Sequence, residues 1–197
     1  DGELLPSLAV RHQVIRAIRE WNADIVLGLR PNDYHPDHRN AGKVVVDASY
    51  MVIVPNVCPD TPPLSKNPLF LYMEDRFQKP YKHEPDVVIA IDETIELKID
   101  GLHAHTSQMY EWLPWTNGGD ASVAKIPTSP KERRVWLAER TKRRSGNINS
   151  DKQAALIKWY GKNVAKTVKY IESFEVAEYG MQPTDEDLRA FFPMIKE

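Results

Sequence analysis

The spacing of apolar residues predicts a helix followed by a strand at the start of the chain. Between residues 7 and 21, Leu8, Ile15 and Ile18 recur at helical spacing, while arginines occupy the opposite face. Residues 24–29 then form a short apolar run, which is typical of a buried strand. A buried strand that directly follows a helix favours a parallel sheet.

A polar loop and a second helix follow this strand. Residues 30–34 are mainly polar and lead to His35, which is placed to cap a helix. Pro36 suits the first helical position, where its missing N–H is not needed. Asp37 complements the positive end of the helix, and apolar residues continue on one face as far as Val52.

Proline changes the character of the chain between residues 55 and 85. Seven of the fifteen prolines fall in these 31 residues, which excludes regular helix except in short pieces. We interpret residues 55–85 as an irregular insertion within a single domain that spans residues 1–197. Residues 69–72 are a possible strand inside it, and residues 85–91 have the pattern of a second buried strand.

The rest of the sequence is predicted to be mainly helical. Residues 94–110 have a helical pattern, residues 114–130 are rich in glycine and proline, and residues 131–144 indicate a basic helix. We interpret residues 151–179 as one or two helices. The alternation of helices and strands indicates the α/β class, although the strands are few for a chain of this length.

Composition and charge restrict the classes of function. The chain of 197 residues is 42% hydrophobic and 27% charged, which is typical of a globular protein and excludes disorder throughout. A net charge of -2 leaves no bulk basic field for nucleic acid. No apolar run approaches the ~20 residues of a membrane helix. The first residue is Asp1 rather than Met, so we expect that the natural N-terminus, with any address it carried, lies upstream.

The single cysteine limits the redox and metal chemistry. Cys58 excludes an intramolecular disulfide and a cysteine-based zinc knuckle, and no base lies near it in sequence, so we interpret it as structural. Lack of disulfides is compatible with a reducing compartment such as the cytoplasm, but the compartment stays open.

The densest polar cluster lies at residues 33–38, which contain two imidazoles and two carboxylates. It falls where a parallel strand ends and a helix begins, and ligands of open α/β sheets collect at that edge. His35 and His38 are three residues apart, so both can face one point across a helical turn. Imidazole is a common zinc ligand, but a catalytic zinc needs about three protein ligands and this cluster supplies one or two. The alternative is that both histidines are solvent-exposed or merely cap the helix.

A second cluster consists of Lys98 with residues 103–108. His103 and His105 would lie ~200° apart on a regular helix, so at most one of them faces a given site. A helix end with polar residues is the alternative interpretation.

Two further features have both a functional and an ordinary structural interpretation. Trp112 and Trp115 could form a sugar-stacking wall or be ordinary core or interface aromatics. The basic run in residues 133–144 could contact phosphate or form a solvated helix face.

Four stretches resemble the LmbE-like (PIG-L) deacetylase family, in the family's order. They are Asp1-Gly2-Glu3-Leu4, residues 31–39 (Pro-Asn-Asp-Tyr-His-Pro-Asp-His-Arg), Lys98 with His105-Thr106-Ser107-Gln108, and residues 170–174 with Phe192-Pro193. The resemblance spans nearly the whole chain.

The resemblance implies a fold, a cofactor and site residues. The fold would be a Rossmann-like three-layer α/β sandwich with a mostly parallel sheet, and the activity a zinc-dependent removal of acetyl groups from N-acetylglucosamine-type sugars or conjugates. His38 would be the metal ligand, His35 would stabilise the oxyanion, and Asp37 would support the site by orienting a histidine.

The family's first motif, His-Pro-Asp-Asp, does not occur in the 197 residues. That motif would supply the other zinc ligands and the catalytic base. We therefore expect residues 1–197 to correspond to the C-terminal two-thirds of such a domain, without its N-terminal strands. The alternatives are a non-catalytic LmbE-like module that binds a sugar or a partner, and a complete metalloenzyme that recruits His105 or a neighbouring subunit.

The expected partner is an amino-sugar small molecule, with a homo-oligomer possible and no membrane span or nucleic acid. Residues 55–85 follow the motif helix, so they are either a substrate-specificity element or a surface connector.

Overall fold

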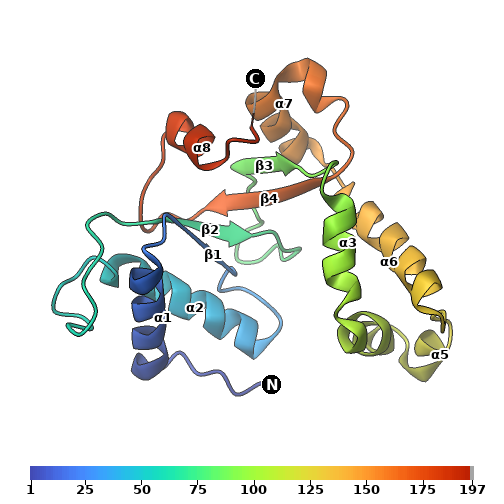
Figure 1. Ribbon diagram of the computed structural model, residues 1–197, viewed down its shortest axis with the longest axis horizontal. Helices are drawn as coiled ribbons and strands as arrows, with labels where there is room; N and C mark the ends of the chain where they lie inside the picture. Colours follow the sequence, from blue (N-terminus) through green and yellow to red (C-terminus); the bar gives the residue numbers. More distant parts are fainter. Residues whose placement is uncertain (196–197) are drawn as a thin grey trace.

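Four strands form the centre of the protein in the computed structural model, which describes residues 1–195 (Figure 1). They are β1 (Ile25–Gly28), β2 (Leu69–Met73), β3 (Val87–Ala90) and β4 (Ile171–Val176), in the sheet order β1-β2-β4-β3. β1 pairs in parallel with β2, while β4 is antiparallel to both β2 and β3. The predicted α/β fold is confirmed. The sheet is mixed rather than mostly parallel: β1, β2 and β3 run the same way, but β4 lies between β2 and β3 and is antiparallel to both, so only the β1–β2 pair is parallel.

Helices make up most of the remaining described structure. They are α1 (Leu8–Trp21), α2 (Pro36–Met51), α3 (Ile95–His103), α4 (Leu113–Thr116), α5 (Gly119–Val123), α6 (Pro130–Ser145), α7 (Ser150–Ala165), α8 (Asp185–Phe191) and the π-helical turn η1 (Gln108–Trp112). Within residues 1–195, no helix combines the length and the apolar character needed to cross a membrane.

The alternation of side chains along β2 explains the layers. Leu69 and Leu71 are buried in one core with residues of α3, α7 and α8, whereas Phe70 and Tyr72 are buried in another core with α1 and α2. Successive side chains of a strand point to opposite faces, so each face of the sheet is covered by its own helices. Burial of both faces stabilises the sheet between two helical layers.

Capping residues set the beginnings of α1 and α2, and the cap of α2 is the one that the sequence predicts. The Ser7 hydroxyl accepts a hydrogen bond from the Val10 N–H at 3.3 Å. His35 is the N-cap of α2, with Pro36 as its first residue and Asp37 in its first turn.

The predicted helix over residues 151–179 is wrong in its second half. α7 ends at Ala165, and residues 171–176 form β4, an internal strand hydrogen-bonded to β2 on one side and to β3 on the other. Buried and partly exposed residues alternate at the start of β4 in a strand period of two. Pairing with β2 and β3, whose partner residues lie 81 to 105 positions earlier in the chain, decided this segment against the helix that the preceding residues continue.

The helix predicted over residues 94–110 is interrupted. α3 ends at His103, and a turn separates it from the helical residues that include η1. Residues 114–130, which the sequence predicts to be an irregular glycine- and proline-rich stretch, include the short helices α4 and α5. Pro114 follows directly on the π-helical turn of residues 108–112, so its missing N–H falls where the regular helical hydrogen-bond pattern is already altered.

Arg19 organises the beginning of the proline-rich segment. Its guanidinium group is buried and donates hydrogen bonds to six backbone carbonyls, those of Met51, Val52, Val54, Val57, Cys58 and Thr61. Four of these carbonyls, those of Met51, Val52, Val54 and Cys58, also accept a backbone N–H, so Arg19 holds together the turns that follow α2. Cys58 is buried in the same region, and β2 lies within the segment 55–85 as an internal strand of the sheet.

Candidate active site at the start of α2

The polar cluster lies at the carboxyl end of β1, where the chain enters α2. Gly42 allows α2 to pack directly against the chain that leaves β1, because a Cβ at Gly42 would clash with the carbonyl oxygen of Leu29. This close approach places His35 and the first turn of α2 at the edge of the sheet. The positive end of the helix dipole points there, which favours a negative charge on a bound group.

The structure brings His35 and His38 together. Their ring centroids are 4.8 Å apart, and the rings are tilted by 33°. Tyr34 presents its ring edge-on to both imidazoles, with centroids at 5.8 and 5.6 Å. The side chain of His38 is 44% exposed and that of His35 is 24% exposed, so both can reach a molecule from solvent.

Asp33 orients His38. Its Oδ1 lies 3.1 Å from His38 Nδ1 and also accepts a hydrogen bond from the His35 backbone N–H at 2.9 Å. When His38 Nδ1 donates to Asp33, the Nε2 lone pair of the neutral ring is left for a metal ion. Asp33 belongs to the polar cluster of residues 33–38, but the sequence pattern assigned it no role of its own. Its position five residues before His38 was the available signal.

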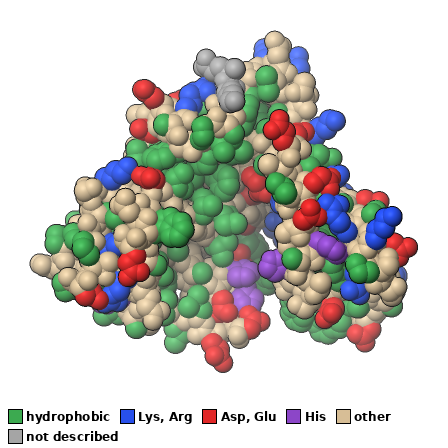
Figure 2. All heavy atoms as spheres, viewed as in Figure 1, with side chains coloured by type: hydrophobic (Ala, Val, Ile, Leu, Met, Phe, Trp, Pro, Cys, Tyr) green, Lys and Arg blue, Asp and Glu red, His purple; other side chains and the backbone are tan. Residues whose placement is uncertain are grey.

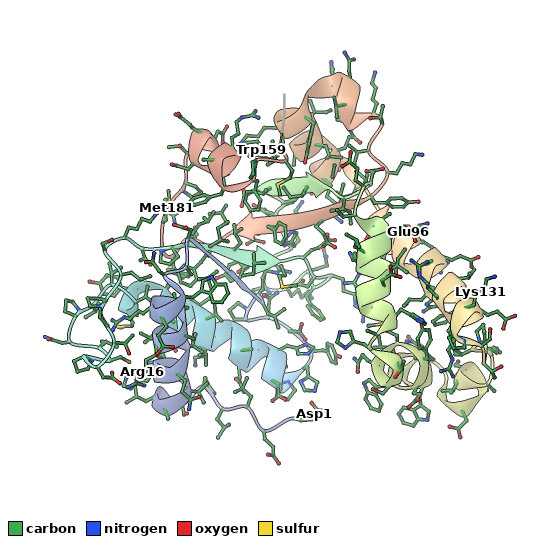
Figure 3. The ribbon with its side chains drawn as sticks, in the orientation of Figure 1. Asp1, Arg16, Glu96, Lys131, Trp159 and Met181 are labelled. Carbon is green, nitrogen blue, oxygen red and sulfur yellow. The ribbon has the colours of Figure 1, made fainter. Side chains whose placement is uncertain are left out.

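The hydrogen bonds of His35 indicate a different role. Its Nδ1 accepts from the Asp37 backbone N–H at 3.2 Å, so a neutral ring carries its proton on Nε2. That Nε2 lies 3.2 Å from the carboxylate of Asp1, at the lower centre of Figure 3. His35 is therefore arranged to donate a hydrogen bond to an oxygen.

Asp37 binds backbone rather than a histidine. Its carboxylate accepts from the N–H of Gly2 at 2.6 Å and from that of Leu4 at 2.9 Å. The hydrogen bond from Gly2 is the main cause that lowers the pKa of Asp37 below its usual value. Asp37 thus fixes the first residues of the chain beside α2.

The described residues fit a metal ion only in part. His38 offers a free nitrogen, but no group of three possible ligands within residues 1–195 includes it. The one such group in that part of the chain is Asp1, His35 and Asp37, whose ligand atoms lie within 4.8 Å of one another. Both oxygens of Asp37 already accept backbone hydrogen bonds, which makes this group a poor cage.

In the second sequence cluster, Lys98 and His103 make structural contacts, whereas His105 lies at the surface. Lys98 forms an ion pair with Glu172 and donates to Ser145 Oγ at 3.0 Å, which connects α3 to β4 and α6. His103 Nδ1 lies 2.6 Å from the hydroxyl of Tyr110. His105 lies beyond the end of α3 and is exposed, so the regular-helix geometry assumed for the two histidines does not apply.

The basic residues of α6 contact α3 in part. Arg134 pairs with Glu96 and Asp100, and Lys142 also pairs with Glu96. These ion pairs use two members of the basic run as structural links between exposed helix faces.

A largely buried polar network lies at the carboxyl end of β2, and no sequence pattern indicates it. Glu74 accepts from Lys152 at 2.6 Å and from Ser173 Oγ at 2.7 Å, and Ser173 Oγ lies 3.3 Å from His83 Nε2. His83 Nδ1 lies 3.5 Å from Glu175. Ser173 is buried and donates to Glu74, so this order of serine, histidine and carboxylate is not an activated nucleophile.

Burial shifts the titration of this network in opposite directions. It lowers the pKa of His83 below the usual histidine value and raises the pKa of Glu175 above the usual carboxyl value. Both shifts favour the uncharged form of the group inside the protein.

The start of α2 faces the C-terminal end of α3 across a gap between two parts of the molecule (Figure 1). Histidine side chains gather on both sides of this gap in Figure 2. The loop after β2 contacts the loop that carries the candidate site, since Asn32 donates to the Lys79 carbonyl at 3.3 Å and the rings of Tyr34 and Phe77 lie 6.3 Å apart.

A curated protein resembles this chain in sequence, whereas no family model matches this chain. The diacetylchitobiose deacetylase of Thermococcus kodakarensis is 28% identical over 120 residues, which are 58% of this chain and 44% of that protein. The N,N'-diacetylchitobiose deacetylase of Pyrococcus horikoshii has the same fold, with a TM-score of 0.54 and 19% identity over 90% of this chain and 54% of that one. This sequence likeness to a deacetylase agrees with the resemblance of the chain to the LmbE-like (PIG-L) deacetylases.

Two other solved structures share the fold. The conserved protein TT1542 of Thermus thermophilus superposes with a TM-score of 0.53 at 19% identity, covering 93% of this chain and 64% of that one. The 4-carboxy-2-hydroxymuconate hydratase GalB of Pseudomonas putida gives 0.57 at 13% identity, covering 90% and 62%. The chain covers less than two thirds of each of these relatives. The fold that it shares with the LmbE-like deacetylases also occurs in a hydratase, so the reaction must be argued from the site.

Proposed function

We propose that residues 1–197 are part of a zinc-dependent deacetylase that hydrolyses the acetamide of an N-acetylglucosamine-type sugar or conjugate. The observation that carries the proposal is the His35–His38 pair at the start of α2, with His38 oriented by Asp33. Similarity to a diacetylchitobiose deacetylase supports the reaction class. In this reaction water adds to the acetamide carbonyl, the C–N bond breaks, and acetate and a free amine leave.

In this proposal His38 holds the metal ion through Nε2. A carboxylate hydrogen bond to the other ring nitrogen is the usual arrangement for a metal-binding histidine, and Asp33 provides it. When bound, zinc would polarise the acetamide carbonyl as a Lewis acid. The further ligands and the carboxylate base would come from the family's His-Pro-Asp-Asp motif, which does not occur in residues 1–197.

His35 stabilises the oxyanion in this proposal. Its Nε2 proton is free to move from the Asp1 carboxylate to the substrate oxygen, and the N-terminus of α2 adds its dipole to the same charge. Removal of one such donor typically lowers the rate by a factor of about 100 to 1,000.

Zinc stoichiometry and turnover separate the two roles. In the full-length protein that contains residues 1–197, His38→Ala should lose bound zinc, whereas His35→Ala should keep zinc and lose at least ~100-fold in deacetylation rate. His12→Ala on α1 is a matched control that should change neither. Full zinc retention in His38→Ala would contradict the assignment of the ligand.

The incomplete ligand set around His38 favours a second candidate, a non-catalytic module that binds a sugar or a partner. Chelation of the purified 197-residue chain, followed by zinc reloading and a measurement of bound zinc, tests whether these residues complete a zinc site. About one tightly held zinc per chain would mean that this chain or its oligomer completes the site. No retained zinc in the chain, together with a zinc-free and inactive full-length protein, would favour the module.

A further inference from the structure

A hollow lies on the short helices that follow α3, away from the His35–His38 pair. It has a volume of about 300 Å³, and its walls come from η1, α4, α5 and the turn before η1. The lining residues are Ser107, Gln108, Glu111, Trp112, Trp115 and Val123. None of them has a part in the proposed deacetylation.

Two tryptophans form one wall of this hollow. The rings of Trp112 and Trp115 are stacked, with centroids 5.6 Å apart and an angle of 16° between the ring planes. Their residues are 52% and 49% exposed. Large aromatic surface left in water is unfavourable, and such a patch commonly marks an interaction site.

The aromatic wall is held on a packed base. Tyr110, in the same π-helical turn as Trp112, is buried in a small core with Ile126 and Leu137. Pro114, between the two tryptophans, is also buried. A ligand would therefore meet rings that are already in place, which reduces the entropy lost on binding.

The π-helical geometry of residues 108–112 is a second unusual feature. A π-helical turn inside a helix is rare and occurs frequently at functional sites. Gln108 and Glu111 of this turn line the hollow together with Trp115 of α4. Polar groups and an aromatic ring consequently line the same hollow.

The polar groups of the hollow have no partners in the protein. Throughout residues 1–195, the side chains of Ser107, Gln108 and Glu111 make no hydrogen bond or ion pair. The amide can donate and accept, the hydroxyl can do both, and the carboxylate accepts. An aromatic face next to unpaired donors and acceptors matches a pyranose ring, which has an apolar C–H face and a rim of hydroxyl groups.

The charge and the volume of the hollow restrict the class of ligand further. Glu111 is the charged residue among those that line the hollow, so a phosphate or another anion is disfavoured, and a neutral or cationic ring is favoured. The volume lies at the lower end of the range for small-molecule sites, which suits one ring rather than a whole oligomer.

We propose that Trp112, Trp115, Glu111 and Gln108 form a subsite for one neutral or cationic pyranose ring, separate from the His35–His38 pair. That the ring belongs to an amino-sugar oligomer rests on the proposed function, whereas the pyranose chemistry rests on the hollow alone. The subsite lies on the same part of the molecule as α3, whose end faces α2 across the gap in Figure 1. It would hold a part of the substrate that does not react.

Tryptophan fluorescence and calorimetry test this subsite without any turnover. The full-length protein, in chelator and with His35→Ala and His38→Ala, should still bind N-acetylated chitotriose, with a change in tryptophan emission. Trp115→Ala should weaken this binding at least ~10-fold, and Glu111→Gln should weaken the fully deacetylated trimer more than the acetylated one. Trp21→Ala, at the 83% exposed tryptophan of α1, is the matched control and should bind normally.

Three results would overturn the proposal. The first is that neither trimer binds at millimolar concentration. The second is that Trp115→Ala and Trp21→Ala bind the trimers with equal affinity. The third is a dimer that dissociates in Trp115→Ala, which would assign the tryptophan wall to contact with a second copy of the chain. Trp115→Phe keeps an aromatic face and should retain binding, so it replaces the alanine variant if that variant does not fold. No deacetylation by the zinc-loaded wild-type protein, together with retained trimer binding, would refute the proposed function and leave the subsite intact.

Discussion

Arg30 connects the candidate site to the loop that follows β2, and its removal should destabilise the protein strongly. The side chain is fully buried and donates to both carboxylate oxygens of Asp75, with the bond from Nε at 2.8 Å. It also donates to the carbonyls of Phe77 and Tyr81, each at 2.9 Å. Burial alone would lower the pKa of Arg30, but the hydrogen bond to Asp75 keeps it above the usual value.

The contacts of Arg30 determine how much stability the protein should lose in Arg30→Met. The carboxylate of Asp75, whose side chain is 15% exposed, would keep its charge but lose its ion-pair partner. The carbonyls of Phe77 and Tyr81 would each lose a hydrogen-bond donor. Breaking a buried ion pair on one side costs about 3–5 kcal/mol. For a protein of about 150–250 residues, each kcal/mol lowers Tm by about 2–4 °C, so the expected loss is about 6–20 °C.

Thermal and urea unfolding of four proteins would measure this coupling. The set is the wild type, Arg30→Met, Asp75→Leu and the double variant. Since the double variant leaves no unpaired buried charge, it should be more stable than the sum of the two single losses predicts. A Tm of Arg30→Met within about 2 °C of the wild type, or strictly additive losses, would refute the reasoning.

Two further predictions concern buried groups. Arg19→Met should lower the free energy of unfolding by more than about 3 kcal/mol in urea, because six backbone carbonyls would lose a charged donor; an unchanged urea midpoint would refute this. For His83, burial lowers the folded-state pKa, so the unfolded chain binds the proton first as pH falls through about 6.5. His83 should therefore make the wild type less stable at pH 5.5 than at pH 7.5, and His83→Gln should reduce that difference when unfolding is followed at both pH values.

Local sequence signals predicted the elements that carry the candidate site. The cap at His35, the proline after it and the apolar face of α2 are all short-range features, and the structure confirms the helix that they indicate. The apolar run before them forms β1. The position of the His35–His38 pair at the carboxyl edge of the sheet followed from these two elements alone.

The contacts of the site needed the tertiary structure. The family resemblance implies that Asp37 orients a histidine, yet its oxygens accept from Gly2 and Leu4, which are more than 30 residues away in sequence. Asp33 contacts His38 instead. Which of two neighbouring carboxylates reaches an imidazole depends on side-chain direction at a helix start, and composition does not encode that direction.

The sequence by itself determined where α1, α2, α3, α6 and α7 begin, where the buried strands β1, β2 and β3 lie, and which residues carry the chemistry at the start of α2. These features depend on capping, apolar periodicity and motif order, which act within a few residues. Only the tertiary structure decided that residues 171–176 form β4, that Arg30 ties the loop after β2 to the site, and that Trp112 and Trp115 stack beside unpaired polar groups. Each of these depends on partners brought together by packing, and long-range packing overrides the weak local preference of a segment.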